Sequence, residues 1–171
     1  MLSLCPHQEG RGTTHPFETV GAPWIDWRLA AAMRNGTGGN STGGGAIPGA
    51  VVRETYFTPT FSKFQGVACG GVFLHVVDAA TFDPLFAALT LISAIARLYP
   101  ASFAWRAPDS EGRYWVDLLS GSNFTRLALD RGEGAAEIVD AWEADDQLVA
   151  FRALRKQYLI PSYAHDQIPN K

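Results

Sequence analysis

Two short apolar runs near the middle of the chain have the length and composition of β-strands. Residues Val51–Thr58 and Val72–Val77 are rich in β-branched and aromatic side chains, which favours extended structure. The connection between them, Pro59–Gly71, is too long for a tight hairpin turn, and loops of that length often carry function. We therefore expect two neighbouring strands joined by a functional loop.

Helical patterns occupy most of the remaining chain. The longest helix is predicted over Phe82–Tyr99, and either Asp78 or Thr81 would cap it. Pro84 falls in its first turn and Pro100 ends it. The apolar residues expected to face the core are Phe86, Leu89, Leu91, Ile92, Ile95 and Leu98.

Shorter elements complete the pattern. Helices are expected over Trp24–Arg34, from a Ser122 cap to about Arg131, over Ala135–Trp142 and over Gln147–Tyr158. We expect Trp115–Leu119 to form a short strand or a buried turn. Together these elements predict an α+β fold, with a small mixed sheet packed against several helices.

Composition narrows the class of protein. The 171 residues are 47% hydrophobic, enough for one ordinary core. The net charge of -3 offers no basic surface to a phosphate backbone, so we expect no nucleic-acid partner. The apolar run Phe86–Leu98 is too short for a membrane span, and the N-terminus lacks the pattern of an export signal. Localisation is left open.

Two segments predict little packed structure. Residues 35–49 are almost entirely Gly, Asn, Ser and Thr, the composition of a flexible surface loop. The tail over residues 161–171 is expected to be disordered. Cys5 and Cys69 have no zinc-ligand spacing and could pair only if the fold brings them together. No metal site or cofactor motif is expected.

The segment Glu9–Thr14, Glu-Gly-Arg-Gly-Thr-Thr, carries the most chemistry. The glycines on either side of Arg11 permit left-handed backbone and close approach of a ligand. The carboxylate, the guanidinium and the two hydroxyls can hold a polar, oxygen-rich ligand. A surface turn is the simpler interpretation of this hexapeptide taken alone.

Further segments change that interpretation. In chain order they are Pro16–Glu18, Gly21–Asp26, Tyr56–Phe64, Cys69–Val72 and Tyr114–Ser122. Together with Glu9–Thr14 they resemble the C-terminal half of the exo-β-N-acetylmuramidase family of bacterial glycoside hydrolases, from about Glu9 to about Leu159. The resemblance implies a two-part protein with a Rossmann-like N-terminal region, a smaller α+β C-terminal region and a cleft between them. It also implies action mostly outside the cytoplasmic membrane.

The same resemblance predicts how the domains are organised. Residues 1–22 would be a motif loop left over from a truncated N-terminal Rossmann-like region. Residues 23–160 would be the C-terminal α+β domain, with an insertion over residues 35–49. The family has another acidic residue well upstream of the motif. A missing or separate polypeptide is therefore expected to supply the N-terminal half.

The implied substrate is the non-reducing terminal N-acetylmuramic acid of peptidoglycan fragments. The motif carboxylate maps to Glu9, which the resemblance implies is catalytic, and the motif arginine maps to Arg11. From its chemistry, Arg11 would pair with the lactyl carboxylate that distinguishes muramic acid from glucosamine. Thr13 and Thr14 would bind sugar hydroxyls or cap the following turn.

The long loop adds Thr58, Thr60 and Lys63, which would line the cleft or lie on a solvated loop. Phe57, Phe61 and Phe64 would form a sugar platform or, as we favour, anchor this loop in the core. The structural alternative for Arg11 is a salt bridge to Glu9 or Glu18. His75 is expected to be a satisfied core or face histidine, and His15 stands where the family usually has an arginine.

Three functions remain open at this point. The chain is best interpreted as part of an exo-acting β-N-acetylmuramidase that depends on an N-terminal half. The alternatives are a non-catalytic carbohydrate-binding or structural remnant of that family, and a plain interaction domain. A glycosidase needs a second carboxylate or its equivalent. The spacing of Glu18, Asp26 and Asp117 places none of them opposite Glu9.

Overall fold

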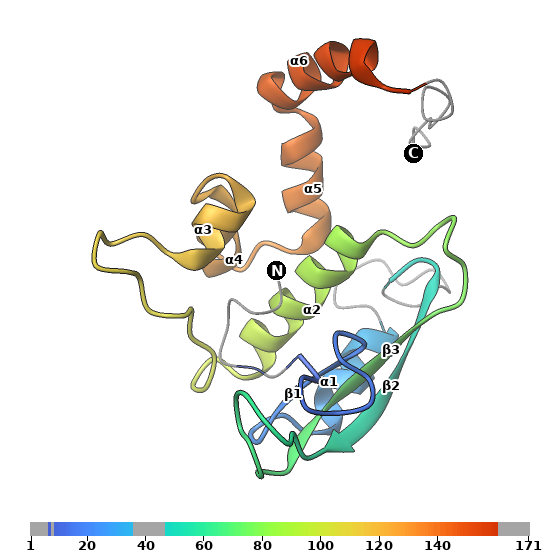
Figure 1. The fold of residues 1–171 in the computed structure, drawn as a ribbon, viewed down its shortest axis with the longest axis vertical. Coiled ribbons are helices and arrows are strands. Elements are labelled where there is room, and N and C mark those ends of the chain that lie inside the picture. Colours follow the sequence, from blue (N-terminus) through green and yellow to red (C-terminus); the bar gives the residue numbers. More distant parts are fainter. Residues whose placement is uncertain (1–6, 8, 36–46, 161–171) are drawn as a thin grey trace. The chain divides into compact units, whose positions relative to one another are not determined.

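A computed structural model describes residue 7 and residues 9–35 and 47–160 (Figure 1). Its sheet consists of β1 (Thr19–Ala22), β2 (Ala50–Phe57) and β3 (Cys69–Val76), in the order β1-β3-β2. Both pairings are antiparallel. The two strands expected from the sequence are confirmed as neighbours. The edge strand β1, which directly follows the Glu9–Thr14 motif, was not expected.

Glycines allow β1 to lie against β3. Gly21 pairs with Gly71 in the register of the two strands. A Cβ atom on Gly71 would lie 2.0 Å from the Val20 carbonyl oxygen, and one on Gly70 would lie 2.2 Å from the Ile25 carbonyl oxygen. A side chain at Gly71 would therefore force β1 away from β3, and one at Gly70 would displace the segment that follows β1 at Ile25.

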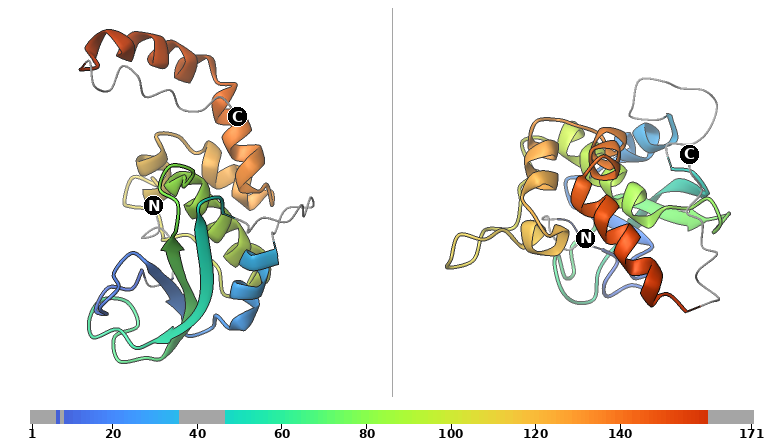
Figure 2. Two further views of the ribbon diagram at one scale, coloured as in Figure 1. Left: turned by 90° about the vertical axis from the view of Figure 1, so that its right-hand side faces the viewer. Right: turned by 90° about the horizontal axis from the view of Figure 1, so that it is seen from above.

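Two helices cover one face of the sheet. They are α1 (Trp27–Asn35) and α2 (Pro84–Leu98), and Figure 2 (left) shows α1 and the blue loop before β1 on opposite sides of the strands. α1 begins three residues later than the sequence predicted. The apolar core beneath the helices includes Val20, Leu29, Met33, Val52, Val72, Leu91 and Ile95.

The N-cap of α2 is Asp83, so the expected caps Asp78 and Thr81 were wrong. The Asp83 side chain accepts hydrogen bonds from the Leu85 and Phe86 backbone N–H groups. Asp78 instead accepts from the Thr81 hydroxyl in the preceding turn. The cap lies directly before Pro84 because proline occupies the first helical position, where no backbone donor is needed.

The segment expected as a strand or buried turn is a short helix, α3 (Trp115–Ser120). Its hydrophobic residues suggested a strand. Instead Gly121, in the left-handed conformation with φ 81°, is the C-cap of this helix. A bidentate ion pair between Arg126 and Asp117, with two N–O distances of 2.9 Å, joins α3 to α4 (Phe124–Asp130). Arg126 lies nine residues after Asp117 in the sequence, so the local pattern of residues 115–119 did not reveal the helix.

The end of the chain forms a second compact unit, residues 136–171. It contains most of α5 (Ala135–Glu143), α6 (Asp146–Arg155) and a 3-10 turn, η2 (Lys156–Tyr158). Within it, Glu143 and Arg152 form an ion pair. These helices confirm the predicted ones to within a few residues. The expected disorder over residues 161–171 and most of the expected linker lie outside the described residues.

The predicted α+β class is confirmed, but the mixed sheet that was expected is wrong, because both strand pairings of the described three-stranded sheet are antiparallel. In the described part of the chain, no helix is long and apolar enough to cross a membrane. A cavity of about 260 Å³ lies between the sheet and α2. It is lined almost entirely by apolar residues, among them Phe17, Val20, Val52, Leu74, Phe82 and Leu91.

Candidate functional site

The Glu9–Phe17 segment, called the motif loop below, closes on itself before entering β1. The Phe17 N–H donates to the Glu9 carbonyl across 2.7 Å. Inside the loop, the Thr13 N–H and hydroxyl both donate to the Gly10 carbonyl, at 3.1 and 2.6 Å. Gly10 and Gly12 have φ of 69° and 76°, values that glycine adopts at no steric cost. The sequence prediction of left-handed glycines here is confirmed.

A second segment, residues 58–68, called the clamp loop below, docks against the motif loop. Thr60 donates twice to the Gly12 carbonyl, from its N–H at 3.0 Å and from its hydroxyl at 2.9 Å. A Cβ atom on Gly12 would lie 2.7 Å from the backbone nitrogens of Thr60 and Phe61. The two loops therefore fit together only because residue 12 has no side chain.

The Glu9 carboxylate lies where the two loops meet. Its side chain is 1% exposed, and Lys63 contacts Oε1 at 2.8 Å while Arg11 Nε lies 3.5 Å from Oε2. Lys63 also donates to the His7 carbonyl at 3.0 Å. A buried charge requires such partners, because removing a carboxylate from water without them is costly. One carboxylate and two cations leave this cluster with one excess positive charge.

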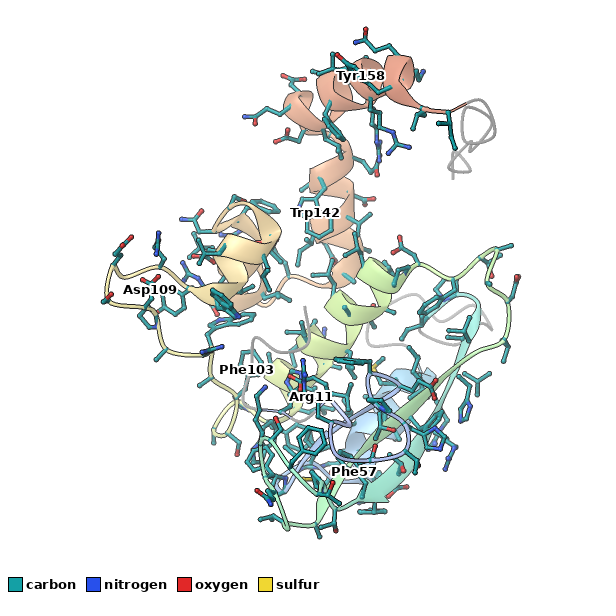
Figure 3. All side chains as sticks on the ribbon, in the orientation of Figure 1. Arg11, Phe57, Phe103, Asp109, Trp142 and Tyr158 are labelled. Atoms are coloured by element: carbon teal, nitrogen blue, oxygen red, sulfur yellow. The ribbon has the colours of Figure 1, made fainter. Side chains whose placement is uncertain are left out.

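Arg11 reaches from the buried carboxylate towards the surface. Its side chain is 43% exposed, and its guanidinium carbon lies 5.0 Å from the centre of the Phe17 ring. Figure 3 labels Arg11 on the motif loop. Within the described residues, its terminal nitrogens make no hydrogen bond. The predicted alternative of an Arg11–Glu9 salt bridge is present, and it leaves the outer edge of the guanidinium open to solvent.

The remaining predicted site residues differ in their surroundings. Thr13 is engaged inside the motif loop, where its hydroxyl also accepts from the His15 N–H at 3.1 Å. Thr60 holds the clamp loop, whereas Thr14 and Thr58 are exposed. The structure thus brings Glu9, Arg11 and Lys63 together in one cluster and uses the threonines mainly to shape or border it.

The aromatic residues of the clamp segment do not form one surface. Phe57 packs close to Gly21, Phe64 packs against the core, and Phe61 is 57% exposed. Phe17 was missed as a candidate, although it is 59% exposed beside Arg11 and has φ of 68°. A left-handed φ for a bulky residue is an outlier that no local sequence signal reveals.

The other acids near the motifs have different partners. Glu18 lies 3.3 Å from His15, and Asp117 binds Arg126. A hydrogen bond from Arg28 lowers the pKa of Asp26, which also accepts from the Tyr99 hydroxyl at 2.9 Å. Each of these three acids is thus engaged by a partner outside the Glu9, Arg11 and Lys63 cluster.

Two further residues considered from sequence have structural surroundings. His75 accepts from Arg53 at 3.0 Å and stacks on Phe73, as expected for a satisfied face histidine. Burial raises the pKa of the Cys69 thiol, which is free; Cys5 lies outside the described residues. Among the residues that the structure describes, no three His, Cys, Asp or Glu side chains are grouped to hold a metal ion.

The sequence matches a known family over nearly all of its length. A family model described as "Exo-beta-N-acetylmuramidase NamZ, C-terminal" matches residues 5–160. The chain belongs to this NamZ C-terminal family. The match spans both the motif loop and the clamp loop, so the Glu9 cluster lies within the region that defines membership.

One curated relative and two solved structures are similar to this chain. The peptidoglycan beta-N-acetylmuramidase NamZ of Bacillus subtilis (strain 168) is 36% identical over 152 residues, which cover 89% of this chain but 33% of that protein. The chain therefore spans about a third of that relative's length.

Both solved structures are of DUF1343 family proteins from Bacteroides fragilis NCTC 9343. One has a TM-score of 0.71 at 24% identity, over 90% of this chain and 38% of its own. The other has a TM-score of 0.52 at 23% identity, over 93% and 37%. At these identities the two structures support the NamZ C-terminal fold.

Proposed function

We propose that this NamZ C-terminal domain forms one wall of a β-N-acetylmuramidase site, at which terminal N-acetylmuramic acid is released from peptidoglycan fragments. The observation that carries the proposal is the Glu9 cluster, a buried carboxylate between Arg11 and Lys63 with a solvent-facing guanidinium. Its excess positive charge suits a sugar that carries one carboxylate. Arg11 binds the lactyl carboxylate through its terminal nitrogens, a planar match that lysine makes less well.

The proposal includes a second region. Residues 1–22, which include the edge strand β1, adjoin a Rossmann-like N-terminal region, residues 23–160 supply the rest of the C-terminal domain, and residues 35–49 are an insertion into it. The N-terminal region provides the opposite wall of the cleft and the second catalytic group, as part of a longer protein or as a separate polypeptide. The coverage of only 33% of the Bacillus subtilis relative supports this organisation.

In this mechanism Glu9 is the carboxylate that the chain contributes to hydrolysis. Glycosidases use one carboxylic acid to protonate the leaving oxygen and a second carboxylate on the other face of the sugar. Thr60 keeps the clamp loop on the motif loop, and Lys63 fixes the orientation of the Glu9 carboxylate. Thr13, Thr14 and Thr58 border the position of the sugar. No cofactor or metal takes part.

One observation favours a second candidate function, a non-catalytic carbohydrate-binding role. The Glu9 side chain is 1% exposed and both of its oxygens face cations. In that role Glu9 would only hold Arg11 and Lys63 in place, and the chain would recognise the sugar without cleaving it. The two functions predict different effects of a neutral residue at position 9 on hydrolysis.

The deciding experiment is hydrolysis of a chromogenic β-N-acetylmuraminide. It compares the chain alone with a chimera in which the chain replaces the matching third of the Bacillus subtilis relative. Each is tested as wild type, as Glu9→Gln and as the control Glu18→Gln, whose acid lies in an exposed contact with His15.

We expect turnover by the chimera, its loss in Glu9→Gln with sugar binding retained, and little effect of Glu18→Gln. Turnover by the chain alone would contradict the need for a second region. Turnover that survives in the Glu9→Gln chimera would reject Glu9 as a catalytic group. Binding of N-acetylmuramic acid by the chain with no turnover in either form would select the non-catalytic function.

A further inference from the structure

Phe17 combines three features at one position of the motif loop. Its backbone has φ of 68°, the residue is 59% exposed, and the Arg11 guanidinium lies 5.0 Å from the ring centre. A bulky residue in this backbone region carries a conformational cost that glycine or asparagine would largely avoid. Such outliers concentrate at ligand sites, where the surrounding structure maintains them.

The surroundings of Phe17 explain how its conformation is maintained. Its N–H donates to the Glu9 carbonyl across 2.7 Å, which closes the motif loop at its base. The next residues enter β1, beginning at Thr19. The backbone is therefore fixed on both sides of residue 17, and the ring is held beside Arg11.

The ring also connects two chemically different surfaces. On the polar side it contacts a guanidinium whose Nε faces the buried Glu9 carboxylate. Phe17 is also one of the residues that line the apolar cavity between the sheet and α2, together with Val20 and Leu74. A ligand whose carboxylate reaches Arg11 would meet apolar surface directly beside that carboxylate.

We infer that Phe17 is a specificity-determining residue of the Arg11 subsite, where its ring packs against the methyl group next to the ligand's carboxylate. This inference rests on the proposed function, because it assigns the lactyl ether of muramic acid to that subsite. Arg11 selects for the negative charge, whereas Phe17 selects for the branched carbon that carries it. An aromatic ring suits this role because it offers a rigid apolar face with few rotatable bonds.

The test compares the binding of three sugars to the full chain by NMR chemical-shift titration. They are N-acetylmuramic acid, the 3-O-carboxymethyl ether of N-acetylglucosamine, which keeps the carboxylate but lacks the methyl group, and N-acetylglucosamine itself. Burying one methyl group is expected to favour N-acetylmuramic acid over the carboxymethyl ether by about fourfold. Both acids should bind more tightly than N-acetylglucosamine.

Two variants isolate the ring. Phe17→Asn adopts the left-handed backbone readily and removes the apolar surface, while Phe17→Tyr keeps the ring as a matched control. We expect Phe17→Asn to bind the two acids equally and still to prefer both over N-acetylglucosamine. Phe17→Tyr should retain the roughly fourfold preference of the wild type. Thermal melts of both variants establish that each is folded.

The outcomes separate this inference from the proposed function. If the wild type prefers the acids but Phe17→Asn keeps the methyl preference, the role of Phe17 is wrong and the Arg11 subsite stands. If the wild type binds both acids no better than N-acetylglucosamine, the recognition of muramic acid by this chain is itself wrong.

Discussion

Gly12 shows most directly how single residues build the candidate site. It has φ of 76°, and its missing side chain leaves room for the backbone of Thr60 and Phe61. Its carbonyl receives both hydrogen bonds from Thr60. One residue therefore sets the turn of the motif loop and the docking of the clamp loop.

Gly12→Ala is expected to destabilise the protein more than Gly66→Ala. Gly66 has a similar φ of 73°, but a Cβ atom there would meet nothing within 4 Å. Both variants incur about 1–2 kcal/mol for a left-handed alanine, and only Gly12→Ala also displaces the clamp loop. Urea unfolding of the two variants measures the difference, and equal losses would contradict the steric contact.

Lys63→Met is expected to reduce the free energy of unfolding by about 1–3 kcal/mol, because it removes a partner of a buried carboxylate. Glu9→Gln in the same chain should recover part of that loss, since the neutral amide needs no cation. A double-mutant cycle measured by urea unfolding gives the coupling directly. Additive losses would show that the 2.8 Å contact contributes little to stability.

At the scale of elements, the sequence predicted the strands and helices whose formation depends on local residue pattern. The two central strands and the long helix were evident from apolar runs and prolines. The strand β1 was missed because Thr19–Ala22 contains two small residues and only four positions in all. The helix α3 was missed because Gly121 and the Arg126–Asp117 ion pair, rather than its own composition, determine its conformation.

The cap of α2 offers a test at this scale. Asp83→Ala should reduce the free energy of unfolding by about 1 kcal/mol, because two backbone N–H groups lose their acceptor. Thr81→Ala is the matched control, since the Thr81 hydroxyl donates hydrogen bonds to Asp78 in the preceding turn and none to the helix N-terminus within the described residues. Thermal melts of both variants compare the losses. A larger loss of stability in Thr81→Ala than in Asp83→Ala would indicate that Thr81, as the sequence suggested, caps the helix.

At the scale of the whole molecule, the site joins residues that lie far apart in sequence. The sequence identified Glu9, Arg11 and Lys63 as candidates through chemistry and family resemblance. It did not predict that Glu9 would be buried, because burial depends on contact with a loop 54 residues further along. The sequence also did not predict a role for Phe17, because side-chain exposure and backbone strain are properties of the folded chain.

Acid should destabilise the protein through its paired carboxylates. Hydrogen bonds lower the pKa of Asp26, from Arg28, and of Glu143, from Arg152. A pKa that is lower in the folded state contributes stability above the ordinary values of 3.8 and 4.5. That contribution disappears as the pH falls through the lowered folded-state pKa.

Asp26→Asn isolates one of these contributions. The variant should be less stable than wild type at neutral pH, where the Asp26 carboxylate is charged and paired. The difference should shrink as the pH is lowered to about 2, below the ordinary value of 3.8, because the contribution of the pair is lost as the pH falls towards the lowered folded-state pKa. Thermal melts at the two pH values measure it. A difference that is the same at both would mean that the charge of Asp26 does not stabilise the fold.

The separation of Glu9 and Lys63 along the chain affects how well the contact between them tolerates insertions in the intervening sequence. The contact closes a ring of chain that runs from residue 9 to residue 63. The entropy of closing a flexible ring grows only with the logarithm of its length, so even doubling the ring would cost only about 0.6 kcal/mol. Insertions between the two loops can therefore leave the contact at Glu9 almost unaffected.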